Sequence, residues 1–200
     1  SENSEADIEG LRKDMIDNVI KPVMKKERIK SDEDTIIHIN PGGIRTGGGP
    51  SVHSGLTGRK TGIDTYGGYA RSSGAALSGK DPMRIDRVGS YIARYAAKNV
   101  VAAGLARECE VQLSYSIGSA DPVSIRVRTF GSSELDDEVI ADRVKQVFDF
   151  RPGGIVRDLG LKKLSAQLGG FYRKLAVYGH MGRRELEVPW ESTAIASKLK

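Results

Sequence analysis

The residues best suited to chemistry lie between Gly55 and Asp86, where glycines and small residues alternate with isolated cations. Glycine lets the backbone approach a ligand closely, and successive free N–H groups in such a loop form an anion-binding concavity. An acidic pair closes the stretch, and a carboxylate beside polyphosphate is the usual way to hold Mg²⁺. Fixed Lys and Arg charges add phosphate contacts; here they are Arg59, Lys60, Arg71, Lys80 and Arg84. The stretch therefore predicts a site for Mg²⁺ and polyphosphate.

The segment Gly74–Lys80 has the G-x4-G-K spacing of a nucleotide-binding P-loop. A P-loop needs a Ser or Thr after the lysine to bind Mg²⁺, and it needs a helix beginning at the lysine. This chain continues instead with Asp81 and Pro82. We therefore reject a P-loop, while a glycine-rich surface loop with solvated charges remains the alternative for this segment taken alone.

The spacing of apolar residues predicts the elements that position this stretch. Helical periodicity predicts amphipathic helices over 5–27, 82–103 and 136–148, and Pro22 should kink or shorten the first. Strict alternation predicts strands over 110–117 and 123–129, joined as a hairpin. Helices alternating with paired strands indicate an α+β class, with helices covering one face of a sheet. The helix over 82–103 directly follows the Lys80 loop, so its N-terminal dipole also favours phosphate.

Weaker patterns predict several shorter features. His180 lies between glycines without a nearby acid in sequence, so we interpret it as structural. The remaining predictions are strands over 35–40 and 63–66, a turn over 40–43, a short helix after Pro152, an amphipathic piece over 172–177 and a poorly ordered tail over 192–200.

Composition excludes some classes of function. With 200 residues, 38% hydrophobic and 28% charged, the chain is typical of a soluble globular protein. The net charge of +5 suits anionic ligands, and a basic nucleic-acid-binding module is a weaker alternative because no recognised module or aromatic–basic pattern is present. No apolar run reaches membrane-spanning length. The single Cys109 and the lack of a signal peptide favour a reducing, cytoplasmic setting.

Long motifs in a fixed order give the chain a family resemblance. They include GLTGRK, IDTYGG, ALSGKDP, YIARYAAKNVVAAGLA, FDFRPGGIVRDLGL and YGHMGR, between Ile36 and Glu191. In these motifs the chain resembles the C-terminal half of the S-adenosylmethionine synthetases (methionine adenosyltransferases). The resemblance implies three related, interleaved domains, each with helices packed on one face of a mainly antiparallel or mixed sheet. Residues 1–48 would finish one domain, 49–87 would be inserted in a second and 88–200 would form the third.

The resemblance also implies roles for individual residues. Arg59 and Lys80 would be catalytic, His53 and Arg84 would bind methionine, and Asp86 would bind Mg²⁺. Four of these site positions depart from the family pattern: Ile44-Arg45 stands for Arg-Phe, His53 for Asp and Arg84 for Lys. The residues implied to bind ATP or polyphosphate are Ile44, Arg45, His53, Arg59, Lys60, Ala76 and Lys80.

The implied function is synthesis of S-adenosylmethionine from ATP and L-methionine, with release of phosphate and diphosphate. The implied cofactors are Mg²⁺ and K⁺. The implied partners are the N-terminal half of the enzyme and a homodimer or homotetramer with shared active sites, without nucleic acid or membrane. We expect the chain alone to be inactive. The alternative is a non-catalytic ATP- or polyphosphate-binding or assembly subunit, which the departures at Arg45 and His53 make plausible.

Overall fold

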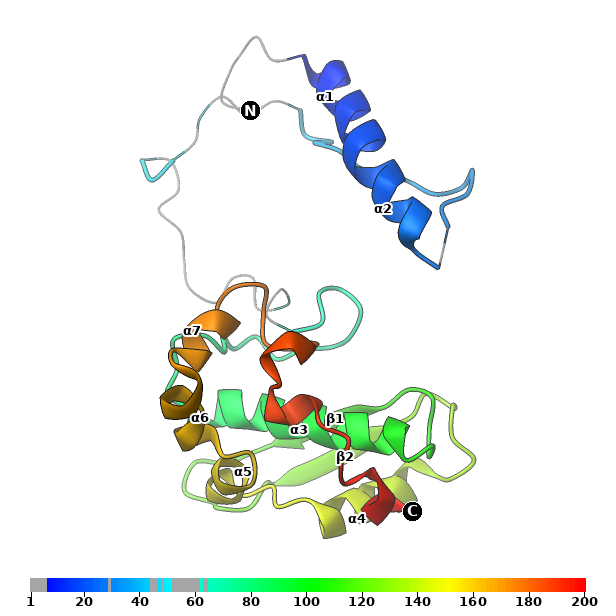
Figure 1. The fold of residues 1–200 in the computed structure, drawn as a ribbon. Coiled ribbons are helices and arrows are strands. Elements are labelled where there is room, and N and C mark those ends of the chain that lie inside the picture. The colour runs from blue at the N-terminus through cyan, green and yellow to red at the C-terminus, as the bar shows by residue number, and fades with distance from the viewer. Residues whose placement is uncertain (1–6, 29, 44–46, 48, 52–61, 63–64) are drawn as a thin grey trace. The chain divides into compact units, whose positions relative to one another are not determined.

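The chain divides into two compact units, Ser1–Leu56 and Thr57–Lys200. The structure, a computed structural model, describes residues 7–28, 30–43, 47, 49–51, 62 and 65–200 (Figure 1).

The first unit contains the predicted N-terminal helix. It consists of α1 (Ile8–Met15), the π-helical turn η1 (Ile16–Ile20) and α2 (Lys21–Lys26). Pro22 does not end the helix, because a π-helical turn precedes it and the Lys21 N–H bonds back to the Ile16 carbonyl. Proline lacks an N–H, and its ring clashes with the carbonyl four residues earlier in a regular α-helix. The wider turn is the usual local adjustment to such a conflict.

The predicted strand over 35–40 is wrong, since residues 35–38 have no regular structure. A strand needs a partner for its backbone groups, and no described segment supplies one. Ile36 and Ile37 remain 78% and 41% exposed. The Arg12 side chain holds the end of this segment through the Ile39 carbonyl at 3.1 Å. The predicted turn after it is confirmed, because the Gly43 N–H bonds the Asn40 carbonyl at 2.9 Å.

The second unit is built on the predicted hairpin. Strands β1 (Glu110–Ser114) and β2 (Ser124–Arg128) pair antiparallel, with Val111 opposite Val127. The helix α3 (Ile85–Ala102) packs on β1 and α4 (Asp137–Val147) packs on β2 (Figure 1). Within this unit the α+β class and the arrangement of helices over one face of a sheet are confirmed.

Helix α3 is the central element of this unit. Its predicted apolar stripe is confirmed, since Val88, Tyr91, Ile92, Ala96 and Val100 are all buried. The helix is followed by Gly104 in the left-handed conformation with φ of 75°, which glycine adopts without strain. The hydrophobic core of the unit therefore forms around α3.

The C-terminal part of the chain wraps against α3. Helices α5 (Pro152–Asp158), α6 (Leu161–Leu168) and α7 (Phe171–Leu175) are followed by the 3-10 turns η3 (Arg184–Leu186), η4 (Pro189–Glu191) and η5 (Ala196–Leu199). Turns η4 and η5 pack on α3, and η5 also contacts α4.

The predicted disordered tail is wrong. Leu199 is fully buried, Ile195 and Ala196 pack against the core, and the Leu199 carbonyl accepts a hydrogen bond from Arg143 at 3.0 Å. The tail is held because its few apolar side chains find a surface on α3 and α4.

Candidate functional site

The glycine-rich loop reaches α3 through residues that are partly anchored in the core. Leu77 is 1% exposed, Ala76 is half-buried, and Gly79 adopts a φ of 78°. The earlier turn departs from the prediction for 63–66. Residues 65–68 form a turn in which the Gly67 N–H bonds the Gly62 carbonyl at 2.7 Å, while Ile63 and Asp64 lie outside the described residues.

Lys80 and Asp86, predicted to bind phosphate and metal, lie side by side. The Lys80 Nζ is 2.5 Å from Asp86 Oδ2, and their side chains are 25% and 40% exposed. Both groups are accessible at the start of α3, where the helix dipole favours an anion. The structure thus joins a cation and a carboxylate that were assigned from separate motifs.

The backbone between these two residues is set by Asp81. Its carboxylate accepts the Met83 N–H at 2.7 Å, and its carbonyl accepts the Arg84 N–H at 3.0 Å. This turn makes α3 begin at Ile85 rather than at Pro82 as predicted. Arg84 is the N-cap residue of α3 and is exposed. It forms no ion pair with any residue that the structure describes.

Five of the predicted site residues lie outside the described part of the chain. They are Ile44, Arg45, His53, Arg59 and Lys60. The structure therefore locates Ala76, Lys80, Arg84 and Asp86 only, and the roles given to the other five stay predictions.

The sequence analysis did not single out Arg87 as part of this site. Arg87 is 3% exposed, and its guanidinium donates to the Lys80 carbonyl and to Tyr91 Oη, the latter at 3.0 Å. The guanidinium also lies over the Tyr172 ring, 4.5 Å from its centroid. An arginine on the apolar stripe of a helix, four residues before a tyrosine, was the available signal.

His180, which we interpreted as structural, is fully buried next to the same loop. Its Nε2 is 2.8 Å from Ser78 Oγ, and its Nδ1 is 2.8 Å from Tyr91 Oη. Burial, together with the positive charges of Arg87 and Arg183, lowers the pKa of His180 to about 4. The imidazole is therefore neutral near pH 7.

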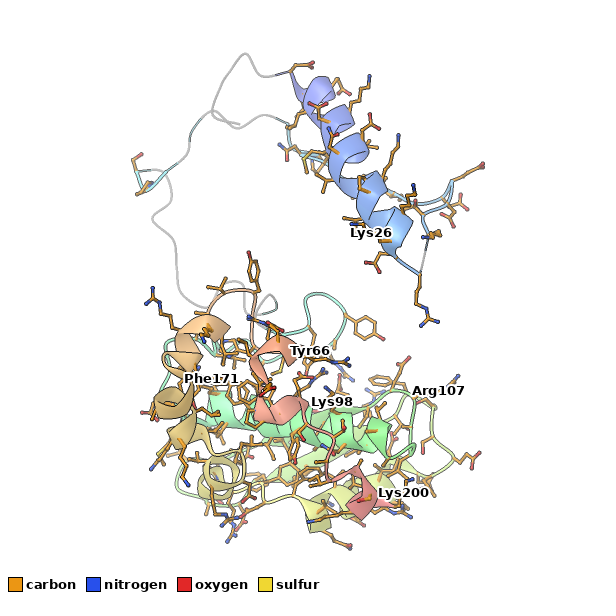
Figure 2. All side chains as sticks on the ribbon, viewed as in Figure 1. Lys26, Tyr66, Lys98, Arg107, Phe171 and Lys200 are labelled. Atoms are coloured by element: carbon orange, nitrogen blue, oxygen red, sulfur yellow. The ribbon has the colours of Figure 1, made fainter. Side chains whose placement is uncertain are left out.

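Glu191 fastens the C-terminal segment to α3. Its carboxylate accepts from Arg94 Nε at 2.9 Å and from Lys98 Nζ at 2.6 Å, and Lys98 is labelled on α3 in Figure 2. It also accepts the Gly182 N–H at 2.8 Å. Burial alone would raise the pKa of Glu191, but these hydrogen bonds lower it to about 2. The resulting buried anion keeps the segment that carries His180 against the helix.

The metal-binding capacity of the described residues is limited. They contain no group of three or more His, Cys, Asp or Glu side chains placed to hold a metal ion. Asp86 nevertheless fits the chemistry of Mg²⁺, which usually takes one or two carboxylates together with phosphate oxygens and waters. Its 40% exposed carboxylate is open to such a ligand set.

The candidate residues lie apart from the hollow beside the hairpin. A hollow of about 440 Å³ lies elsewhere, between the hairpin and α4, lined in part by Ile125, Lys145 and Phe148. It contains none of the predicted site residues. The side chains of Lys80 and Asp86 are 25% and 40% exposed, so both can contact a ligand from solvent.

None of the helices in the described part of the chain is long and apolar enough to cross a membrane.

The second unit is thus an α+β unit in which Lys80, at the end of a glycine-rich loop, contacts Asp86 in the first turn of α3. Residues 47–192 match the family model for the C-terminal domain of S-adenosylmethionine synthetase. The chain therefore belongs to the S-adenosylmethionine synthetase family.

Named relatives agree with this assignment. The chain is similar to the S-adenosylmethionine synthases of Crocosphaera subtropica and Trichormus variabilis, each 51% identical over 191 residues. That alignment covers 95% of this chain and 46% of each relative. The synthase of Synechococcus elongatus is 49% identical over 193 residues, covering 96% of this chain and 46% of the relative. The chain thus spans about half the length of the curated relatives it matches.

Proposed function

We propose that this chain is the C-terminal half of an enzyme that makes S-adenosylmethionine from ATP and L-methionine, releasing phosphate and diphosphate. The family membership supports the reaction. The contact between Lys80 and Asp86 is the observation in the structure that carries the proposal. It supports the proposal because it brings the cation proposed to bind phosphate and the carboxylate proposed to bind metal to one helix terminus.

This reaction requires stabilisation of its leaving group, the triphosphate of ATP. The methionine sulfur forms a bond to C5′ of ATP, and the bond from C5′ to the triphosphate oxygen breaks with its electron pair. Water then hydrolyses the released triphosphate to phosphate and diphosphate. Cations fixed in a water-poor site stabilise the negative charge that develops on triphosphate. We assign this role to four cations, which are Arg59, Lys60, Lys80 and Arg84.

The remaining contacts position the two substrates. Arg84 and His53 would contact methionine, and the guanidinium plane of Arg45 could stack on adenine. Ile44, Ala76 and His53 would complete the nucleotide site.

The proposed enzyme uses Mg²⁺ and K⁺. Asp86 would hold Mg²⁺, which neutralises phosphate charge when it is bound. The exposed carboxylate beside Lys80 supports this assignment. The other ligands for both ions would come from the N-terminal half and from the substrate.

The proposed architecture follows from the same half-length match. Residues 1–48 would complete one domain, 49–87 would belong to a second and 88–200 would form a third. The partners are the N-terminal half of the enzyme and further copies of it in a homodimer or homotetramer. We place the enzyme in the cytoplasm.

The second candidate is a non-catalytic ATP- or polyphosphate-binding or assembly subunit. His53 favours it, because an imidazole does not replace a carboxylate in a salt bridge to the methionine ammonium group. This candidate predicts binding of the nucleotide without formation of product.

Complementation distinguishes the two candidates. The chain is combined with the N-terminal half of the Crocosphaera subtropica synthase, and S-adenosylmethionine and phosphate are measured after addition of ATP, methionine, Mg²⁺ and K⁺. We expect product from the pair and none from either half alone. ATP binding without product, when the intact relative is active in the same assay, would favour the non-catalytic subunit. Turnover by the isolated 200-residue chain would contradict the assignment of groups to the missing half.

Lys80 provides the direct test of the binding surface. Lys80→Ala should weaken binding of inorganic triphosphate with Mg²⁺ by about tenfold to a hundredfold, because a charge-assisted contact is lost. Calorimetric titration of the 200-residue chain measures this affinity. The matched control is Lys145→Ala, which removes another lysine paired with an aspartate, Asp142, at 2.9 Å. Equal affinities of the two variants would contradict the assignment of Lys80.

A further inference from the structure

We propose that His180 is a positioning residue for the Lys80 loop. It holds the loop through the Ser78 hydroxyl, so that Lys80 is presented to polyphosphate, and it does not touch the ligand itself. The polyphosphate ligand rests on the proposed function above, whereas the attachment of the loop stands on the contacts of the described residues alone.

The first support is the placement of the imidazole. His180 is 0% exposed and lies 102 residues from Ser78 in sequence, yet its Nε2 and the Ser78 Oγ are only 2.8 Å apart. Ser78 precedes Lys80 by two residues and is separated from it only by Gly79. A contact at Ser78 therefore restrains a glycine-containing segment that would otherwise have wide conformational freedom.

The second support is that the loop is also held at Lys80, through a chain of hydrogen bonds that ends at His180. The Arg87 guanidinium donates to the Lys80 carbonyl and also to Tyr91 Oη. Tyr91 Oη is in turn 2.8 Å from His180 Nδ1. The two fixed points, Ser78 and Lys80, are thus connected through one buried network, and such networks hold their members in a single arrangement.

The third support is that His180 is itself held rigidly. The Trp190 indole N–H donates to the His180 carbonyl at 2.8 Å. The Trp190 ring stacks on Tyr91, with centroids 3.7 Å apart and planes inclined by 4°. The turn that carries His180 is also joined to Glu191, which accepts the Gly182 N–H at 2.8 Å. These contacts hold the imidazole in one position, from which it can restrain the loop.

A neutral imidazole suits this role because its two nitrogens face two different hydroxyl groups. One nitrogen donates and the other accepts, so both hydroxyls find a partner in either tautomer. Amide side chains can replace one nitrogen at a time. Gln reaches the position of Nε2, next to Ser78, and Asn reaches that of Nδ1, next to Tyr91. A comparison of the Gln and Asn variants therefore distinguishes the hydrogen bond to Ser78 from the general packing of the side chain at position 180.

The experiment uses the 200-residue chain and four variants: Ser78→Ala, His180→Asn, His180→Gln and the double variant Ser78→Ala/His180→Asn. Backbone order parameters of Ser78, Gly79 and Lys80 are measured by ¹⁵N relaxation without ligand. Affinity for inorganic triphosphate with Mg²⁺ is measured by calorimetry. Fluorescence of Trp190, the only tryptophan, checks that each variant retains its core.

Ser78→Ala and His180→Asn should each lower the order parameters at 78–80 from about 0.85 toward 0.6. Each should weaken triphosphate binding about threefold to tenfold, which corresponds to one hydrogen bond. The double variant should lose no more than either single variant, because both changes break the same contact. His180→Gln should restore most of the order and affinity.

Unchanged order parameters in Ser78→Ala would overturn the proposal. It would also be overturned if His180→Gln were as impaired as His180→Asn, since position 180 would then act through packing alone. If the unaltered chain does not bind triphosphate, the proposed function fails at this site. The order parameters then still decide whether His180 holds the loop.

Discussion

His180 is a buried group whose charge state should control stability in mild acid. Its pKa is lowered to about 4 in the folded chain by burial and by neighbouring Arg87 and Arg183, compared with about 6.5 when unfolded. The unfolded state therefore binds more protons between these values. Stability from this group is fully present above pH 6.5 and is lost as the pH falls toward 4.

The predicted size of this effect is measurable. Lowering the pH from 7 to 5 should reduce the free energy of unfolding by about 2 kcal/mol through His180. Urea unfolding followed by Trp190 fluorescence measures it at both pH values. His180→Gln should remove most of this pH dependence, whereas His38→Gln, at an exposed position in the first unit, should retain it. The same slope in His180→Gln as in the unaltered chain would contradict this account of the imidazole.

His180 shows which properties of a single residue can be predicted from sequence and which cannot. A structural role could be predicted for it from the neighbouring glycines and the lack of an acid nearby in sequence. Its contacts to Ser78 and Tyr91 could not, because they lie 102 and 89 residues away in sequence. The pair of Lys80 and Asp86 was easier to anticipate, since the two residues are only six apart at the start of a strongly patterned helix.

At the scale of elements, two glycines in helices should respond in opposite ways to alanine. A Cβ at Gly89 in α3 would lie 3.6 Å from Tyr115 Cε2, which is ordinary contact. Gly89→Ala should therefore stabilise the chain by about 0.5–1 kcal/mol, the usual gain in a helix interior. A Cβ at Gly154 in α5 would lie 2.1 Å from Asp149 Oδ2.

Gly154→Ala must displace the Asp149 carboxylate, which accepts the Arg151 N–H at 3.0 Å before α5. The loss should exceed the gain in helix propensity, for a net destabilisation of about 1 kcal/mol. Thermal unfolding should place the melting temperature of Gly89→Ala above that of the unaltered chain and that of Gly154→Ala below it. Stabilisation by both substitutions would mean that helix propensity alone governs the two sites.

The elements that could be predicted are those whose stability is encoded locally or by a repeated pattern. Helix α3 and the hairpin carry a long apolar stripe and a strict alternation, and both were confirmed. The segment over 35–40 has strand-like residues, but a strand also requires a partner that its sequence cannot supply. The tail over 192–200 was mispredicted because its order depends on a surface formed by α3 and α4.

At the scale of the whole molecule, the two units differ in how much apolar surface they bury by themselves. Among the described residues, every buried side chain lies between Leu77 and Leu199. The helical run over 8–26 buries none, and Val19 and Val23 remain 45% and 50% exposed. In proteins most of the stability of a helix comes from packing of its apolar face and not from intrinsic propensity. The first unit should therefore depend on a further packing surface, such as the N-terminal half of the enzyme proposed above.

Removal of residues 1–56 should leave the second unit intact. We expect residues 57–200 to unfold in urea at the same midpoint and with the same slope as the 200-residue chain, because the core that unfolds is contained in this part. Trp190 reports on that core directly, since it is fully buried and stacked on Tyr91. A peptide of residues 1–43 should show little helical circular dichroism alone. It should gain helix only with the N-terminal half of a relative, if that half covers its apolar face. A lower midpoint for residues 57–200 would instead show that the first unit already contributes to the stability of the second.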